Sequence, residues 1–256
     1  MFNVDYLNEL RTAEMGRLVP YIPAGSRVLE FGAGTGQQAR FLADLGFDVV
    51  AIDLAQSNYA EHLVFPVRQY DGEHIPLEDG SVDVVFSSNV LEHVENIPAI
   101  MAEFRRILRP DGFGLHVMPT PAWRLWTFIT GIANSGVIAC RTPRDLARPP
   151  EGQGRWRLLR QNLRSIAAGM VPLGHGTSPE GISELYTFSR YAWVRLFRKH
   201  GFDVVYDKPM CLHYTGHMLL GRRLPFGTRA RMSRLLGSAT RIYVVKPGAF
   251  GDEASG

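Results

Sequence analysis

The sequence is short of cysteine, lysine and long apolar runs. Cys140 and Cys211 are too few for a disulfide framework. No uninterrupted apolar run reaches the length of about 18 residues that would predict a membrane-spanning helix. The first ten residues, MFNVDYLNEL, contain acidic residues and no apolar stretch, so a signal peptide is not expected. Together these absences predict a cytoplasmic protein.

What is present suits a folded enzyme-sized domain. Hydrophobic residues make up 45% of the 256 residues and charged residues 21%, which excludes global disorder. The length fits one α/β domain with an insertion.

The net charge of +3 conceals an uneven distribution. Residues 1–120 contain 8 basic and 17 acidic residues, a net of −9, whereas residues 121–256 contain 20 and 8, a net of +12. A basic half indicates an anionic partner such as phosphate, acidic lipid or nucleic acid. The alternative is that the arginines are a consequence of genomic base composition.

The first half alternates between strand-like and helix-like segments. Short apolar runs predict buried strands, and capping residues such as Asn96 and Gly46 predict the ends of helices. Short turns between them favour a doubly wound parallel sheet. The predicted strands are Arg27–Phe31, Val49–Ile52, Leu63–Tyr70, Val82–Ser88 and Phe113–Met118, and the helices are Gln37–Leu45 and residues 96–108.

The pattern stops at about Pro119 and resumes near Ser189. A helix is predicted over Arg190–His200, followed by strands at Phe202–Tyr206 and Thr240–Lys246. We therefore expect a single domain over residues 1–256, with a core of about 20–120 and 186–247. Residues 121–185 are expected to form a helical insertion after the fifth strand.

A glycine-rich loop, Gly32-Ala33-Gly34-Thr35-Gly36, follows the first predicted strand. A ligand there would meet backbone N–H groups and a helix N-terminus. The loop departs from the dinucleotide pattern G-x-G-x-x-G, because Gln37 occupies the position of the last glycine. Glu30, just before the loop, would repel a pyrophosphate but suits an ammonium or sulfonium group. Asp53 ends the second strand, where it could accept hydrogen bonds from ribose hydroxyls.

Taken in order, these residues resemble class I S-adenosylmethionine-dependent methyltransferases of the methyltransferase-11 type. EFGAGTG looks like that family's first motif, and DGEHIPLEDGSVDVV is similar to its D-A-x-x-L-P-F-x-D-x-S-F-D-x-V segment. RRILRPDGFG resembles the helix and turn before the fifth strand. The resemblance covers Val28–Met118 closely and Tyr186–Lys246 loosely. It implies a Rossmann-like sheet of about seven strands with the last one antiparallel, and S-adenosylmethionine as cofactor.

The resemblance also implies a cofactor site. Asp53 matches the acid that holds the ribose, Asp71 the acid near the adenine amino group, and the SNVLEHV segment the part that touches the methionine moiety. Taken singly, each of these acids could equally be a turn or cap residue, and Glu92 and His93 are interpreted as packing or capping residues. No metal site is predicted. The expected cofactor-binding residues are Glu30, Gly32, Ala33, Gly34, Gly36, Asp53, Leu54, Asp71, Gly72, Glu73 and Asn89.

The insertion bears on the methyl acceptor, because it leaves from the carboxyl edge of the sheet, where ligands bind. It could form a lid or an acceptor-binding wall. Its apolar stripe could pack on the main domain, or residues 123–170 could contact an anionic membrane surface peripherally. The segment Arg155–Met170 carries two stripes at helical spacing: Trp156, Leu159, Leu163, Ile166 and Met170, and Arg157, Arg160 and Arg164.

The predicted activity is methyl transfer to a small-molecule or glycolipid-like acceptor, at oxygen. His175 is the first candidate for a general base, with His213 and His217 as alternatives. The motifs of base-amino and cytosine-C5 methyltransferases are missing, which argues against nucleic acid. Two other interpretations stay open: an RNA-directed enzyme that uses the basic half, including Arg222–Arg241, and a non-catalytic scaffold of the same fold. The oligomeric state is not predicted.

Overall fold

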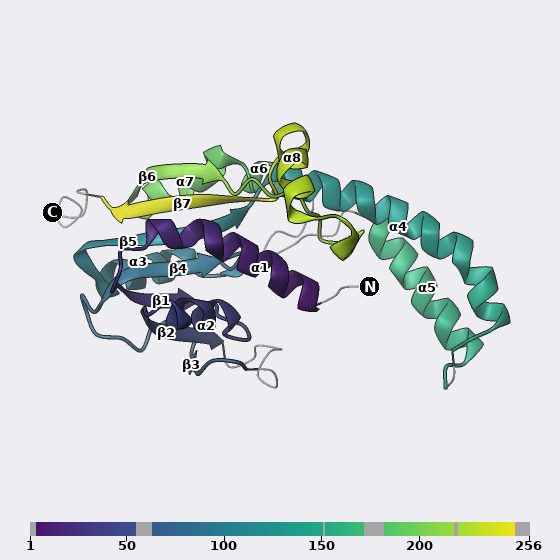
Figure 1. Cartoon of the computed structure of the whole chain (residues 1–256), viewed down its shortest axis with the longest axis horizontal. Helices are drawn as coiled ribbons and strands as arrows, with labels where there is room; N and C mark the ends of the chain where they lie inside the picture. The colour runs from purple at the N-terminus through teal and green to yellow at the C-terminus, as the bar shows by residue number, and fades with distance from the viewer. Residues whose placement is uncertain (1–3, 55–62, 151, 172–181, 218–219, 249–256) are drawn as a thin grey trace.

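The structure is a computed structural model, and it describes residues 4–54, 63–150, 152–171, 182–217 and 220–248. Figure 1 shows two parts: a layered body built on one β-sheet, and a long helical hairpin that projects from one end of it. The glycine loop belongs to the body.

Seven strands form the sheet in the order β3-β2-β1-β4-β5-β7-β6. The strands β1 to β5 run parallel to one another. The strand β7 is antiparallel to both of its neighbours, β5 and β6. The predicted doubly wound, mostly parallel sheet is therefore confirmed, including its antiparallel last strand. The strands are β1 (Arg27–Phe31), β2 (Asp48–Leu54), β3 (Val67–Tyr70), β4 (Val82–Ser88), β5 (Leu108–Pro119), β6 (Phe202–Pro209) and β7 (Thr240–Pro247).

The strand predicted over Leu63–Tyr70 is too long. Only its second half, Val67–Tyr70, pairs with β2. Pro66 immediately precedes this half, and proline has no N–H group to donate to a neighbouring strand.

The predicted turn at residues 109–112 is assigned to the strand β5. Leu108 pairs with Val82 and Phe113 pairs with Val84, so the four residues between Leu108 and Phe113 form an irregularity in the strand pairing. The Arg-Pro-Asp-Gly segment thus forms a bulge-like irregularity within the strand instead of a separate turn before it.

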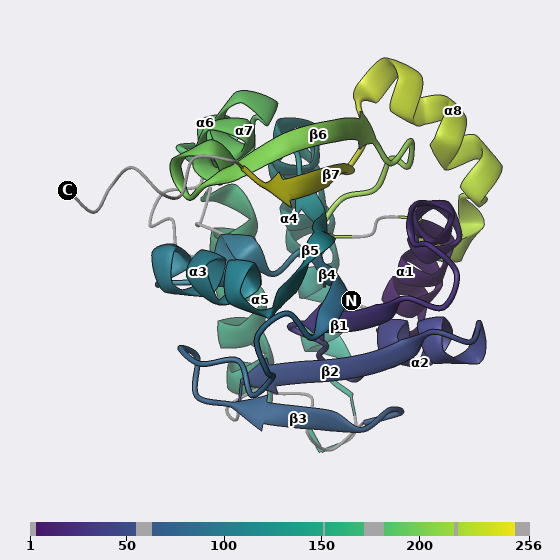
Figure 2. The ribbon, with the colours of Figure 1, turned by 90° about the vertical axis from the view of Figure 1, so that its left-hand side faces the viewer.

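Helices cover both faces of the sheet, as Figure 2 shows end-on. On one face, Met15 and Leu18 of the first helix and Leu42 of the second pack on apolar strand residues. On the other face the third and seventh helices pack, with Phe104 and Phe197 among their buried residues. The helices are α1 (Val4–Leu18), α2 (Gln37–Asp44), α3 (Ile97–Ile107), α4 (Pro121–Ala147), α5 (Arg155–Met170), α6 (Glu184–Thr187), α7 (Arg190–Lys199) and α8 (Phe226–Leu236), with short 3-10 turns at Val19–Tyr21, Leu91–His93 and Gly221–Arg223.

Local signals placed most of these helices well. The side chain of Asn96 accepts a hydrogen bond from the backbone N–H of Ala99 at 3.3 Å, so it caps α3 as predicted. Gly46 follows α2 with φ of 89°, a conformation that favours glycine. By contrast, α1 was not predicted, although Leu10, Met15 and Leu18 are fully buried against the body.

The insertion forms the hairpin of α4 and α5, and the extensive contacts of α5 are with α4. The two helices approach closely where Gly169 faces Gly131 and Ser135. Ser135 Oγ donates a hydrogen bond to the carbonyl of Ile166 at 3.0 Å. In the described part of the chain, no helix combines the length and apolarity that crossing a membrane requires.

The basic stretch Arg222–Arg241 is largely helical rather than a loop, because α8 occupies most of it. Arg229 is 2% exposed and its guanidinium donates hydrogen bonds to three backbone carbonyls, those of His213, Gly221 and Leu224. This arginine therefore holds the fold together and is not available to an anionic ligand.

Candidate active site

The glycine loop lies where β1 ends and α2 begins, beside the end of β2. The backbone N–H groups of Gly32 and Ala33 both donate to the carbonyl of Ile52, at 2.9 and 3.0 Å. Gly36 is the N-cap of α2 and has a left-handed conformation. The loop is thus held against β2 with the first turn of α2 directly behind it, an arrangement that suits an anionic or polar ligand.

Glycine is required in this loop by the protein itself. Gly32 and Gly36 have φ of 75° and 76°. A Cβ on Gly32 would lie 2.5 Å from Val90 Cγ1, and one on Gly36 would lie 2.8 Å from Phe65 Cβ. The structure shows that neighbouring side chains already demand them.

Asp53 joins β2 to the loop. Its carboxylate accepts hydrogen bonds from the N–H of Gly34 and from the N–H of Leu54, both at 2.7 Å. Each carboxylate oxygen can accept more than one hydrogen bond. Asp53 can therefore hold the loop in place and still accept hydrogen bonds from a ribose.

Glu30 places a carboxyl group beneath the loop and is 2% exposed. Burial raises its pKa to about 8, and the nearby carboxylate of Asp53 contributes in the same direction. Its Oε2 atom has no hydrogen-bond partner among the described residues. A buried carboxyl oxygen without a partner among the described residues can accept a hydrogen bond from an ammonium group such as that of a methionine moiety.

Asp71 forms a turn directly after β3. Its Oδ1 atom accepts hydrogen bonds from the N–H groups of Glu73 and His74, at 2.8 and 2.7 Å. These backbone donors lower the pKa of Asp71 to about 2. Leu54 is 47% exposed, and its Cδ2 atom lies 3.3 Å from where a Cβ on Gly72 would be. The ends of β2 and β3 thus place an exposed apolar side chain beside the turn of Asp71.

Asn89, just beyond β4, has an unusual backbone conformation with φ of 54°. Its N–H donates to the carbonyl of Val117 at 2.8 Å. With the amide oriented so that its oxygen faces α1, this oxygen accepts from Arg11 Nη1 at 2.7 Å. Arg11 also pairs with Glu14 at 2.8 Å. Neither α1 residue was predicted, and the contact of Arg11 with Asn89 joins segments that are far apart in the chain.

Buried acids continue along the carboxyl edge. Glu92 is 5% exposed, and burial raises its pKa to about 8, with a further increase from Glu184 and an opposing effect of Arg11. Glu184 is fully buried and pairs with Arg124 of α4 at 2.9 Å. Asn96 caps α3, so Glu92 does not serve as that cap. Its burial agrees with the interpretation of Glu92 as a packing residue.

The candidate bases occupy different environments. His175 lies outside the described residues. His213 is buried, with Nδ1 3.1 Å from the carbonyl of Gly237 and its ring edge-on to Trp126. His217 is half-buried beside α4, near Gly131. Burial lowers the pKa of both His213 and His217, so each is neutral at physiological pH.

His116 behaves as predicted for a packing residue. It is 1% exposed, and its ring stacks between those of Phe104 and Phe197. Its Nδ1 atom lies 2.8 Å from Ser87 Oγ. Burial lowers the pKa of His116 to about 3.

Comparisons with known proteins agree with this geometry. Residues 29–115 match the family profile described as "Methyltransferase domain". The malonyl-[acyl-carrier protein] O-methyltransferase of Pectobacterium atrosepticum is 32% identical over 114 residues, which are 42% of this chain and 45% of that protein. The sarcosine/dimethylglycine N-methyltransferase of Aphanothece halophytica is 36% identical over 101 residues, 35% of this chain and 36% of that protein. The chain thus spans less than half the length of each of these relatives.

A solved structure shows the same fold over nearly the whole chain. The SAM-dependent methyltransferase from Archaeoglobus fulgidus superposes with a TM-score of 0.54 at 14% identity, covering 93% of each chain. The matched segment 29–115 contains the end of β1, the glycine loop, Asp53 and β4. This segment therefore matches a methyltransferase domain, and the fold around it is the one seen in the solved structure from Archaeoglobus fulgidus.

Proposed function

We propose that the protein transfers a methyl group from S-adenosylmethionine to an oxygen atom of a small-molecule or lipid-linked acceptor. The observation that carries the cofactor assignment is the buried Glu30 carboxyl beneath a loop that Asp53 ties to β2. The Glu30 and Asp53 carboxyl groups, which lie in different environments, would then face the two polar parts of the cofactor, its amino acid and its ribose.

Different residues would contact different parts of the cofactor. Glu30 would accept from the α-ammonium group, with the N–H groups of the loop and Asn89 near the methionine moiety. Asp53 would accept from the ribose hydroxyls, and the adenine would lie against Leu54 near the turn formed by Asp71 to Glu73. The cofactor supplies a methyl group that is already activated by its sulfonium, so the protein must orient the reactants and remove a proton from a hydroxyl acceptor.

The acceptor would enter at the carboxyl edge of the sheet, between the loop and the start of α4. His175 remains the first proposed base, with His213 and His217 as alternatives. Glu92 is not added to them, because a carboxyl group with a pKa of about 8 already holds its proton near neutral pH. The relatives differ in the atom their names specify, oxygen in one and nitrogen in the other. The identity of the methylated atom is therefore tested by analysing the reaction product.

Calorimetric titration of three ligands tests the cofactor site: S-adenosylmethionine, S-adenosylhomocysteine and methylthioadenosine, which lacks the amino acid. Asp53→Ala should weaken all three by at least about tenfold, because ribose contacts are common to them. Glu30→Gln should weaken the first two and leave methylthioadenosine unchanged. Product analysis by mass spectrometry with hydroxyl acceptors then tests the transfer.

Asp44→Ala is the matched control, since Asp44 lies on α2 in an exposed pair with Arg40. It should leave all three affinities unchanged. Thermal unfolding must show that Asp53→Ala is folded, because Asp53 also holds Gly34. Well-folded protein that binds none of the three ligands would contradict the proposal and favour the scaffold interpretation. RNA affinity that falls steeply with salt would favour the RNA-directed alternative.

A further inference from the structure

Among the residues that the structure describes, none packs on the outer face of α5. Leu158, Asn162 and Gly169 face α4, and Asn162 Nδ2 donates to Thr142 Oγ1 at 3.0 Å. The opposite side of the helix is exposed over its whole length. The sequence analysis allowed this stripe to pack on the main domain, but Figure 1 shows the hairpin projecting away from the body.

Large apolar side chains occupy this free face. Trp156, Leu163 and Met170 are 78%, 55% and 60% exposed. They are spaced by seven residues, which places them in one row along the helix. Leu159 and Ile166, which belong to the same stripe in the sequence, are half-buried. The structure thus divides the stripe into a packed part and a free row.

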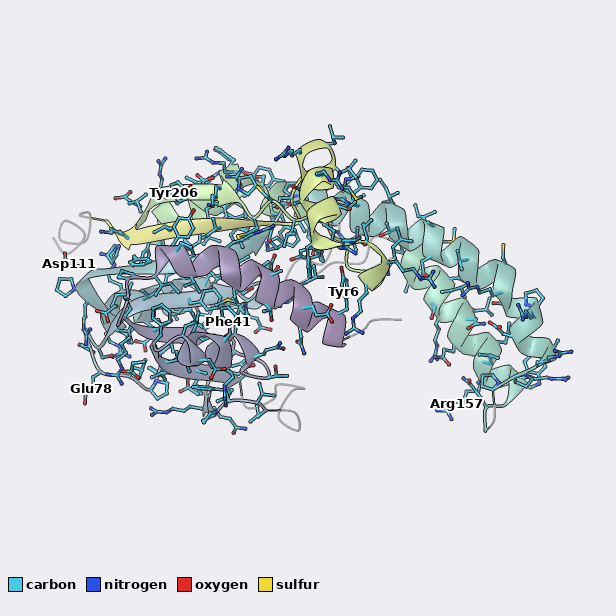
Figure 3. The ribbon with its side chains drawn as sticks, in the orientation of Figure 1. Tyr6, Phe41, Glu78, Asp111, Arg157 and Tyr206 are labelled. Atoms are coloured by element: carbon cyan, nitrogen blue, oxygen red, sulfur yellow. The ribbon has the colours of Figure 1, made fainter. Side chains whose placement is uncertain are left out.

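Arginines flank the row. Trp156, Arg157, Arg160 and Arg164 line an open hollow on the surface of α5 together with Gln161 and Ser165. Figure 3 shows Arg157 near the end of the hairpin that is farthest from the sheet.

The basic character extends around the end of the hairpin. Residues 141–164 contain seven arginines but only Asp145 and Glu151 as acids. All seven are exposed, and in the described part of the chain none of them forms an ion pair. They are Arg141, Arg144, Arg148, Arg155, Arg157, Arg160 and Arg164.

We infer that the hairpin binds the surface of an anionic lipid bilayer through this face. An exposed tryptophan and aliphatic row between unpaired arginines is typical of helices that lie in the interface, with the apolar side chains below the headgroups. Phosphate alone, as in nucleic acid, would match the arginines but leave Leu163 and Met170 in water. A lipid surface satisfies both sets of side chains.

Docking would have a consequence for the proposed reaction. α4 begins at Pro121, two residues after the carboxyl end of β5, so the hairpin and the candidate acceptor entrance share one edge of the sheet. This link rests on the proposed function, whereas lipid binding itself does not. A lipid-linked acceptor would reach the entrance without leaving the bilayer.

Vesicle co-sedimentation of the full chain tests the inference. We expect binding to vesicles that contain phosphatidylserine and little binding to phosphatidylcholine alone. Arg157→Glu, Arg160→Glu and Arg164→Glu together should reduce binding by about a hundredfold or more, given the contribution of each arginine near an anionic surface. Trp156→Ala, which changes no charge, should reduce it by a smaller factor.

The matched control reverses three exposed charges on α7, with Arg195→Glu, Arg198→Glu and Lys199→Glu, and should leave binding unchanged. Thermal unfolding and cofactor titration check that every variant is folded. Failure of the wild-type protein to bind, or equal binding of the triple α5 variant, would overturn the inference. Binding of RNA or an acidic protein through the same arginines, without vesicle binding, would also overturn it. Asp53→Ala should weaken cofactor binding without affecting vesicle binding. A failure of the membrane inference can therefore be distinguished from a failure of the proposed function.

Discussion

At the scale of the residue, Glu30 links the stability of the protein to pH. Its folded-state pKa of about 8 exceeds the ordinary value of 4.5, so the folded protein holds a proton that the unfolded chain has lost in that window. Stability should therefore be full below the ordinary pKa and decrease as pH rises toward 8. Glu92 contributes in the same direction.

The first prediction concerns this window. Without cofactor, the melting temperature should decrease between about pH 5 and pH 8, and Glu30→Gln should reduce the slope, because glutamine cannot ionise. If Glu30 accepts the ammonium of the cofactor, binding must also release a proton near neutral pH. Calorimetry in buffers of different ionisation enthalpy measures that release. An unchanged slope and unchanged proton release in Glu30→Gln would contradict the role of this carboxyl.

The second prediction concerns the glycine loop. Gly32→Ala should lower the free energy of unfolding by about 2–3 kcal/mol, through the positive φ and overlap with the side chain of Val90. Adding Val90→Ala removes the overlap, so the double variant should be more stable than the sum of the single effects predicts. Denaturant unfolding of the four proteins measures the coupling. Strict additivity would show that Val90 is not what excludes a side chain at position 32.

At the scale of the element, a buried carboxylate of α1 contacts the C-terminal part of the chain. Glu14 is fully buried and accepts hydrogen bonds from Tyr214 at 2.9 Å and Thr240 at 2.6 Å, as well as pairing with Arg11. Arg11 in turn faces Asn89 at the cofactor site. The position of α1 and the shape of the site therefore depend on the same group.

The third prediction follows from this attachment. Glu14→Ala should destabilise the protein by about 3 kcal/mol or more, because it leaves the largely buried Arg11 without its carboxylate and Tyr214 and Thr240 without their acceptor. Tyr214→Phe should cost only about 1–2 kcal/mol, since it removes one hydrogen bond. Glu9→Ala, an exposed acid on the same helix that pairs with Arg222, serves as control and should change stability little. Similar losses for Glu14→Ala and Glu9→Ala in chemical denaturation would argue against the anchor.

At the scale of the whole molecule, α4 packs on the body near its start, where Trp126 Nε1 donates to the carbonyl of Leu236, whereas α5 packs mainly on α4. The core of the body lies between the sheet and its covering helices. The hairpin is held together by its own narrow contact, where Gly169 meets Gly131. A change in that contact should leave the cofactor site intact.

The fourth prediction concerns this contact. A side chain at position 169 would overlap Ser135 Oγ and the carbonyl of Gly131, so Gly169→Leu should separate α5 from α4. Hydrogen exchange should accelerate in α5, while affinity for S-adenosylmethionine stays within about twofold of wild type. Ala168→Leu, at an exposed neighbouring position, is the control. Loss of cofactor affinity in Gly169→Leu would show that the two units are coupled.

The sequence by itself determined the features that depend on near neighbours. Short segments of the sequence specify the strands of the first half and the cap at Asn96. They also specify the order of the glycine loop, Asp53 and Asp71, so all of these were predictable without a structure. The family resemblance then indicated the cofactor. The two errors, at Pro66 and at residues 109–112, concerned only where strands β3 and β5 begin relative to a local turn.

Tertiary structure decided what depends on distant contacts. Glu14 interrupts the apolar side of α1, and it is stable there because Arg11, Tyr214 and Thr240 surround it. This interruption of the apolar pattern is why the helix was not predicted. The pKa values of Glu30 and Glu92 arise from burial, and burial is not written in a motif. Likewise, the sequence showed one apolar stripe on α5, but only the packing of α5 on α4 decided which of its residues remain free to meet a partner.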